Sequence, residues 1–463
     1  MKKNIALTAL MAALVLAGCV TPPPIDTTKL PATPAAFKEG DGRWTVAQPA
    51  DAQPRGEWWK AFGDPVLDEL IARAEARNDR IQIAAARLTQ ARALLRSADA
   101  ERLPQVGVGA GAVRGTDPST GTKPSTLLSA GANFSYEVDL FGRLARASDA
   151  ASLDAQAREA LLQSARLVVQ ADVAQTYFAL RALDVENALL RDTVAAYRDT
   201  LRLTERRYQA GDVAELDVAR VRSEAAATES DALAVQRQRS VLEHALAVLV
   251  GEPASNFTLT GGEWKALPIV PAGVPGSVLA RRPDVAAAQR QLQAAQARVG
   301  VAQAAWFPSV QLTAAGGYAS PELSDLFKWS ARAWSVGALL SLPVFDGGRR
   351  SAGIQSATAE MDAALARYRE QVLVAFKDVE DELSSLRLLA EQSQAQGTAV
   401  DSASRATALS ASRYRNGMIS QLELLDAQRS ELRNRRAATQ VRAAQYQATV
   451  GLIRALGGSW QSA

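Results

Sequence analysis

The longest stretch of the chain without proline or glycine runs from Arg143 to Tyr208 and is rich in Ala, Leu, Arg, Gln and Glu. This composition predicts one continuous helix, because proline and glycine are the residues that most often end helices. At about 1.5 Å per residue the helix is roughly 100 Å long, several times the length of an ordinary core helix. A second helical pattern runs back from about 215 to 250 after Gly211, so we expect an antiparallel helical hairpin.

The same stretch occurs twice in the chain. Residues that correspond at a spacing of about 206 are Gly142 and Gly348, Arg207 and Arg413, Tyr208 and Tyr414, Gly211 and Gly417, and Gly251 and Gly457. Further upstream, Pro104 corresponds to Pro308 at a spacing of about 204. The chain is therefore predicted to be a tandem duplication of one elongated unit.

The N-terminus resembles a lipoprotein signal peptide. Two lysines precede a short apolar run, and Leu16-Ala17-Gly18 stands directly before Cys19, the only cysteine. We expect residues 1–18 to be removed and Cys19 to carry a covalent lipid, with no other cofactor; the alternative is an ordinary signal with an incidental cysteine. No other segment is apolar enough for a membrane-spanning helix. The formal charge of +3 gives no strong field for nucleic acid, so we expect no such partner.

Four segments alternate apolar and polar residues in the manner of β-strands. They span 104–114, 128–139, 309–318 and 334–343. Each has about 9–11 residues, the length of a membrane β-strand. Alternation alone also fits a half-buried sheet in a soluble domain. However, the only helices available to cover such a sheet are far longer than the strands, whereas lipid can cover its apolar face.

Four strands cannot close a barrel, and unpaired strand edges are not tolerated in hydrocarbon, so the edges must pair between chains. We expect a homotrimer of twelve strands and twelve helical columns, a membrane β-barrel continued by a long α-helical barrel. The predicted domains are an extended segment 19–64, a first repeat 65–275 and a second repeat 276–463. The first repeat has a helix from about 66 to 102, a helical hairpin at 143–250 and an equatorial segment 251–275, and the second has its hairpin at 348–457.

Several motifs resemble the TolC-like outer membrane factors, specifically the NodT family of efflux lipoproteins. The most specific are Trp58-Trp59-Lys60-Ala61-Phe62-Gly63-Asp64-Pro65, Arg281-Arg282-Pro283-Asp284-Val285, and Arg413-Tyr414-Arg415-Asn416-Gly417 followed by Leu424-Leu425-Asp426-Ala427-Gln428. The resemblance implies an outer-membrane exit duct of a tripartite pump that expels drugs or other small toxic compounds. Its implied partners are further copies of the chain, a periplasmic adapter, an inner-membrane transporter of the RND type, and outer-membrane lipid.

The resemblance also implies two sets of site residues. The periplasmic aperture comprises Leu422, Asp426, Arg413 and Tyr414, and the adapter-docking tips comprise Gly211, Asp212, Gly417 and Met418. Spacing alone favours a packing role for Leu422 and a solvated acid at Asp426, and only the family motif favours the aperture. The repeat also places Arg220 in register with Asp426, where an ion pair could neutralise the carboxylate.

No enzyme site is expected. His244 is the only histidine, and without a Cys partner it builds no usual metal or nucleophile site, so packing at a helix interface is the expected role. The acids Asp378, Glu380, Asp381 and Glu382 are expected on a solvated helix face. The alternatives left open are type I secretion, metal-ion efflux, and a periplasmic coiled-coil scaffold or adapter without a channel.

Overall fold

The computed structural model describes residues 23–39, 56–116, 124–260, 264, 267–268, 270, 278–279 and 281–458. Cys19 lies outside the described residues. The chain divides into two compact units. The strand unit comprises Met1–Pro31, Ala86–Ala160 and Ala287–Gln371, and the hairpin unit comprises Ala32–Ala85, Leu161–Ala286 and Val372–Ala463.

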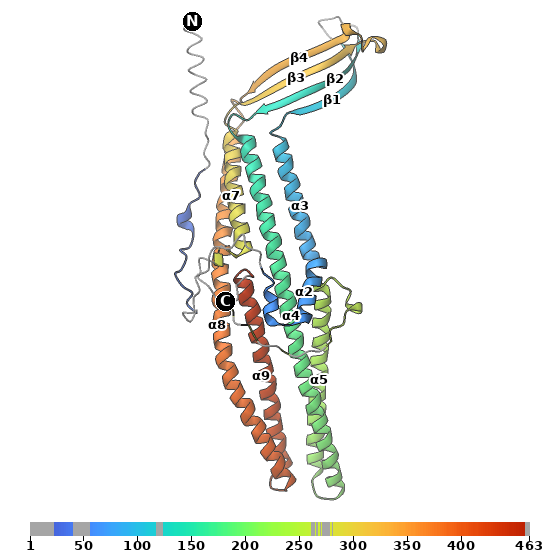
Figure 1. The fold of residues 1–463 in the computed structure, drawn as a ribbon, viewed down its shortest axis with the longest axis vertical. Coiled ribbons are helices and arrows are strands. Elements are labelled where there is room, and N and C mark those ends of the chain that lie inside the picture. The colour runs from blue at the N-terminus through green and yellow to red at the C-terminus, as the bar shows by residue number, and fades with distance from the viewer. Residues whose placement is uncertain are drawn as a thin grey trace. The chain divides into compact units, whose positions relative to one another are not determined.

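The elements follow the predicted duplication (Figure 1). The α-helices are α2 (Pro65–Arg77), α3 (Asp79–Ala100), α4 (Arg143–Gln209), α5 (Glu215–Leu249), α7 (Pro283–Ala304), α8 (Arg349–Arg415) and α9 (Gln421–Ala455). The strands are β1 (Gln105–Gly115), β2 (Ser125–Val138), β3 (Ser309–Ser320) and β4 (Arg332–Ser341). Short 3-10 turns are η1 (Thr27–Lys29), η2 (Trp58–Phe62), η3 (Ala254–Asn256), η4 (Leu323–Asp325) and η5 (Trp329–Ala331).

The strand unit contains one antiparallel sheet in the order β1-β2-β3-β4. Its register places most of the apolar residues of the four strands on one face, because Val108 lies opposite Ala132, Ala132 opposite Gly316, and Ala314 opposite Val336. Many of the apolar side chains on this face are exposed in the single chain, including Val108 at 86% and Val336 at 75%. Within the described residues of the single chain, these apolar side chains of the sheet are therefore not covered by other elements.

The helices of the strand unit pack on one another and on the N-terminal segment. Leu292 and Ala295 of α7 meet Leu365 of α8 in a buried cluster, against which Ile25 and Leu30 pack. The side chain of Gln296 also donates a hydrogen bond to the carbonyl of Pro23, 2.8 Å away. The described part of the extended N-terminal segment thus lies on helix surfaces, where its apolar side chains escape water.

The hairpin unit consists mainly of two antiparallel helix pairs, α4 with α5 and α8 with α9 (Figure 1). Its core gathers aromatic side chains that are distant in sequence. The ring of Phe178 lies 4.9 Å from that of Phe62 and 4.5 Å from that of Tyr446. Trp58 and Trp59 are also buried there. The aromatic motif at 58–65 is therefore part of the core of this unit.

One helix boundary differs from the prediction. The helix expected from about 66 to 102 is broken at Asn78, whose backbone is extended. The Asn78 side chain accepts a hydrogen bond from the Arg80 backbone (2.9 Å) and donates one to the Leu249 carbonyl (2.8 Å). The first bond caps the start of α3, and the second provides a donor for a carbonyl in the last turn of α5. The break between α2 and α3 therefore depends on Leu249, which is far from Asn78 in sequence. Within the described residues, no helix has both the length and the apolarity to cross a membrane.

Candidate functional site

The turns of the two hairpins have the same backbone geometry. The amide of Asp212 donates to the Arg207 carbonyl at 2.8 Å, and the amide of Met418 donates to the Arg413 carbonyl at 2.9 Å. Gly211 and Gly417 have φ of +82° and +66°, left-handed conformations that close each helix at little steric cost. Space is open around both glycines, and Met418 is 67% exposed. The predicted docking residues therefore form two exposed tips.

The two hairpins contact each other directly above these tips. Nη1 of Arg207 lies 3.2 Å from the Tyr414 hydroxyl, and its guanidinium lies 5.6 Å from the centre of the Tyr414 ring. Tyr414 is buried, whereas Arg413 and Tyr208, the repeat equivalents of this pair, are exposed. Tyr414 is one of the predicted aperture residues, whereas Arg207 is not, although the repeat marks Arg207 as the counterpart of Arg413.

Leu422 and Asp426 lie in the first turns of α9 and are both exposed. Leu422 is 45% exposed, so within one chain it is not a core residue. The neighbouring Leu425 is buried with Tyr197 and Val221 of the other hairpin. This contact fixes the rotation of α9, and it leaves Leu422 and Asp426 on the exposed side of the helix.

The charges around Asp426 differ from the register suggested by the repeat. Arg220 lies 3.6 Å from Asp217, and no ion pair joins it to Asp426, both being within the described part of the chain. One turn beyond Asp426, Arg429 forms an ion pair with Glu224 of α5. Hydrogen bonding to Glu224 is the main cause that raises the pKa of Arg429, and the Asp426 charge adds to it. The cation that interacts with the Asp426 carboxylate is therefore Arg429, and not Arg220 as the repeat suggested.

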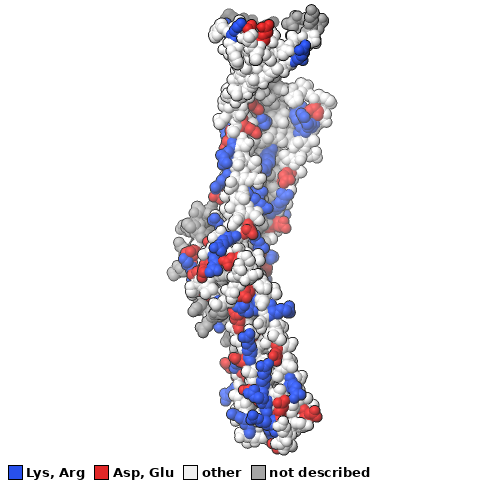
Figure 2. Space-filling model, turned by 90° about the vertical axis from the view of Figure 1, so that its right-hand side faces the viewer, with Lys and Arg blue, Asp and Glu red and all other residues white. Residues whose placement is uncertain are grey.

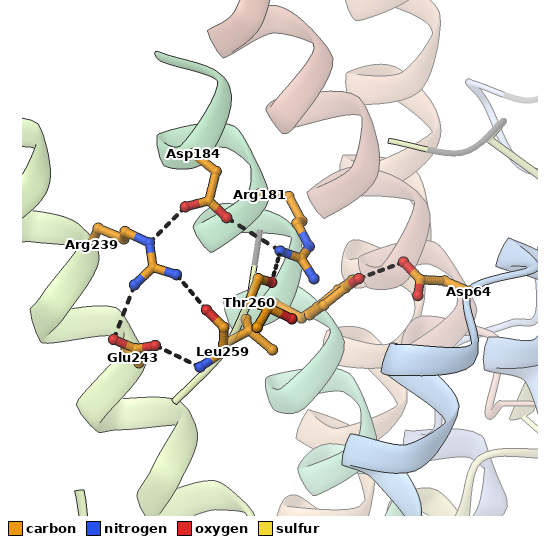
Figure 3. Close-up of polar contacts among 8 residues, drawn as sticks. Asp64, Arg181, Asp184, Arg239, Glu243, Leu259 and Thr260 are labelled. Atoms are coloured by element: carbon orange, nitrogen blue, oxygen red, sulfur yellow. Dashed lines mark hydrogen bonds and ion pairs between the residues drawn. The ribbon is translucent and has the colours of Figure 1, made fainter. Parts of the chain in front are cut away.

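A second group of polar residues fixes the segment that follows α5 (Figure 3). Arg239 donates to Asp184 (2.6 Å), to Glu243 (3.0 Å) and to the Leu259 carbonyl (2.7 Å). Arg181 donates to the Thr260 carbonyl at 2.6 Å and is only 1% exposed. Because these arginines satisfy backbone carbonyls that lie in no helix or strand, they hold the start of the predicted equatorial segment on the hairpin.

The same group continues to the N-terminus of α2. The hydroxyl of Tyr177 donates to Asp64 at 2.5 Å, and Asp64 also accepts a hydrogen bond from the amide of Val66 at 3.0 Å. Burial first, and then the hydrogen bond to Asp64, raise the pKa of Tyr177. Burial alone lowers the pKa of Arg239, but its bonds to Asp184 and Glu243 raise it overall. The group is a set of paired charges with a structural role.

Two minor predictions are corrected by the structure. The acids of α8 do not all lie on a solvated face, because Glu380 accepts the backbone amides of Lys38 (2.7 Å) and Glu39 (2.9 Å), and Asp378 lies 3.0 Å from Arg282. Residues 38 and 39 of the N-terminal segment contact that face, and the periodicity of the helix alone does not reveal such a contact.

His244 is exposed on α5, whereas Leu246 and Ala247 beside it are buried, so His244 does not pack at a helix interface within the chain. In the described residues, no group of three or more His, Cys, Asp or Glu could hold a metal ion.

Acidic and basic side chains alternate along the helices in the face drawn in Figure 2, without a large region of one sign. The sheet carries little charge apart from its ends. This distribution fits a chain whose sheet meets an apolar phase and whose helices meet water.

Comparison with known proteins places this fold among known channels. The structure matches that of the outer-membrane channel OprN with a TM-score of 0.87 and 32% identity, covering 96% of this chain and 100% of that one. It also matches the open state of the Neisseria gonorrhoeae MtrE outer membrane channel with a TM-score of 0.84 and 27% identity, over 95% and 98% of the two chains. The fold is therefore that of the TolC-like outer-membrane channels, as expected from the sequence motifs.

Sequence comparison gives the family. The family model described as outer membrane efflux protein matches residues 70–252 and 274–458. The pyoverdine export outer membrane protein OpmQ of Pseudomonas aeruginosa is 35% identical, over 99% of this chain and 98% of its own length. The toluene efflux pump outer membrane protein TtgC of Pseudomonas putida is 31% identical, over 97% and 94%. The chain belongs to the outer membrane efflux protein family, and the predicted outer-membrane localisation is confirmed.

Proposed function

We propose that the chain is the exit duct of a tripartite efflux pump and passively conducts small toxic compounds from the periplasm to the outside. It works as a homotrimer together with a periplasmic adapter and an inner-membrane transporter of the RND type. The observation that carries the proposal is the four-stranded sheet, which has an exposed apolar face and whose outer edges, on β1 and β4, have no strand partner among the described residues. Such a sheet is unsuited to a soluble scaffold and suited to a barrel shared between copies.

The proposal is tested with the full-length protein purified in detergent. Light scattering should give a particle of three chains, and the same sample should conduct ions across planar lipid bilayers without an energy source. A monodisperse single chain that forms no channel would contradict the proposal. Cation export, which the name of the Escherichia coli relative CusC states for that protein, is the second candidate cargo. Comparing the sensitivity of a deletion strain to copper and to organic solvents separates the two.

Lipidation of Cys19 is proposed from the Leu16-Ala17-Gly18 that precedes it. Cells expressing the wild type should incorporate labelled palmitate into the protein, and cells expressing Cys19→Ser should not. The barrel is a separate membrane attachment, so the variant should still reach the membrane fraction if it is exported. Equal labelling of the two proteins would place the lipid elsewhere or show that there is none.

The tips are proposed as the adapter-docking surface. Gly211→Trp and Gly417→Trp place bulk where space is open around both glycines. Each should abolish drug resistance while the amount of protein in the outer membrane stays at the wild-type level, because contact with the adapter requires a close approach to the exposed turn. Gly353→Trp, on the open surface of α8 in the strand unit, is the control and should preserve resistance. Full resistance in both tip variants would contradict docking at this place.

A further inference from the structure

The apolar face of the sheet, which holds Val108, Ala132 and Val336, carries charge at one end only. Among the residues that the four described strands place on this face, only Arg114 of β1 and Arg332 of β4 are charged, and both are cations. Helices α3, α4, α7 and α8 adjoin the other ends of the strands. Both arginines therefore lie at the end of the sheet that is farther along the strands from the helices.

Arg332 lies in a cluster of aromatic rings at this end. Its guanidinium lies 4.1 Å from the centre of the Trp329 ring. Tyr318 is opposite Arg332 in the pairing of β3 with β4, and the Tyr318 ring lies 5.7 Å from that of Phe327. Phe327 and Trp329 are 71% and 75% exposed. These four residues, the hairpin-end cluster, thus place a cation among large apolar surfaces that the described part of the chain leaves uncovered.

The positive charge of the hairpin-end cluster is not balanced by an acid. Lys328, the other cation of this loop, lies 2.7 Å from Asp325, so these two charges compensate each other. Arg332 forms no ion pair with a carboxylate among the residues that the structure describes. Stacking of its guanidinium on Trp329 occupies the flat face of the group, and the N–H donors at its edge can meet an acceptor. This planar fork of donors matches the oxygens of a phosphate.

We propose that the hairpin-end cluster binds the phosphate of an anionic lipid in the leaflet farther from the helices. Arg332 donates hydrogen bonds to the phosphate oxygens, and the rings of Phe327 and Trp329 lie against the apolar part of the same lipid. A soluble phosphate would use the arginine alone, whereas the exposed rings beside it complement acyl chains. Arg114, at the other edge of the sheet, offers a second cation to the same leaflet. The inference goes beyond conduction and requires of the proposed function only that the apolar face lies in the membrane.

Binding of lipid A tests the inference, because the phosphates of lipid A can be removed without changing its acyl chains. The full-length protein in neutral detergent, titrated in native mass spectrometry, should bind bisphosphorylated lipid A about tenfold more tightly than the dephosphorylated form. Arg332→Gln should lose most of this preference. Arg332→Lys keeps the charge without the planar fork and should retain part of it. Arg290→Gln, on the exposed surface of α7, is the matched control and should bind like the wild type.

Trp329→Ala should weaken the binding of both forms of lipid A, because Trp329 contacts the guanidinium and, in the proposal, the acyl chains. Circular dichroism should show the wild-type helix content in every variant. Equal affinity of Arg332→Gln and the wild type for bisphosphorylated lipid A would overturn the inference. Equal affinity of the wild type for the two forms of lipid A would also overturn it, and so would displacement of the lipid by an excess of inorganic phosphate, which would show a site for the free anion.

Conductance in planar bilayers separates this inference from the proposed function. Arg332→Gln should conduct like the wild type while it loses lipid A. Normal lipid A binding together with altered conductance in Arg332→Gln and Trp329→Ala would place the cluster at the channel opening and overturn the inference. A wild-type protein that binds lipid A with the expected preference but forms no channel would refute the proposed duct and leave the lipid site supported.

Discussion

Gly251→Ala and Gly457→Ala should each destabilise the protein by roughly 2–5 kcal/mol. Both glycines follow the last turn of a helix with positive φ, +74° and +88°. An added Cβ at Gly251 would lie 2.8 Å from the Arg77 carbonyl oxygen, and one at Gly457 would lie 2.8 Å from the Arg281 carbonyl oxygen. A backbone oxygen cannot rotate away as a flexible side chain can, so the helix end or the facing backbone must move.

The measurement is the midpoint of thermal unfolding followed by the circular dichroism of the helices. We expect it to fall by several degrees in each variant. Gly211→Ala is the matched control, because Gly211 has φ of +82° but open space around it. The control should lose only the roughly 1–2 kcal/mol of a left-handed residue with a side chain. A control as unstable as Gly251→Ala would show that the close approach to Arg77 contributes nothing.

Leu422→Ser combined with Asp426→Ala should raise single-channel conductance in planar bilayers several-fold and weaken cation selectivity. In the proposed trimer, threefold symmetry repeats Leu422 and Asp426 as rings around the axis, and three carboxylates brought close together attract cations. Removing the leucine widens such a constriction, and removing the aspartate removes its charge. Arg413→Ala should loosen the same end, because Arg413 is the exposed repeat equivalent of Arg207, which binds Tyr414.

The matched control removes the same chemistry elsewhere on a hairpin. Glu229 and Leu233 of α5 are also four residues apart and exposed. Glu229→Ala with Leu233→Ser should conduct like the wild type. A double variant at Leu422 and Asp426 that conducts no better than this control would place the constriction at another level of the helices.

The sequence located the elements whose signals are local. The run without proline or glycine predicted a helix from 143 to 208, and α4 spans Arg143–Gln209. The strand boundaries lay within three residues of those observed, and most of the apolar residues of the alternation share one face of the sheet. The sequence also predicted the helix ends at Gly211 and Gly417, because a positive φ depends on one residue and its neighbours in the chain.

The side-chain partners were decided only by the tertiary structure. Sequence register suggested Arg220 near Asp426, whereas packing of Leu425 on the other hairpin brings Arg429 to Glu224. The helix break at Asn78 is stabilised by a hydrogen bond from the Asn78 side chain to the Leu249 carbonyl. The buried guanidinium of Arg181 likewise has its hydrogen-bond partner in the Thr260 carbonyl. Periodicity along one helix determines which face is buried. It does not determine how far that helix slides or rotates against another, and this sliding and rotation set every pairing between residues distant in the chain.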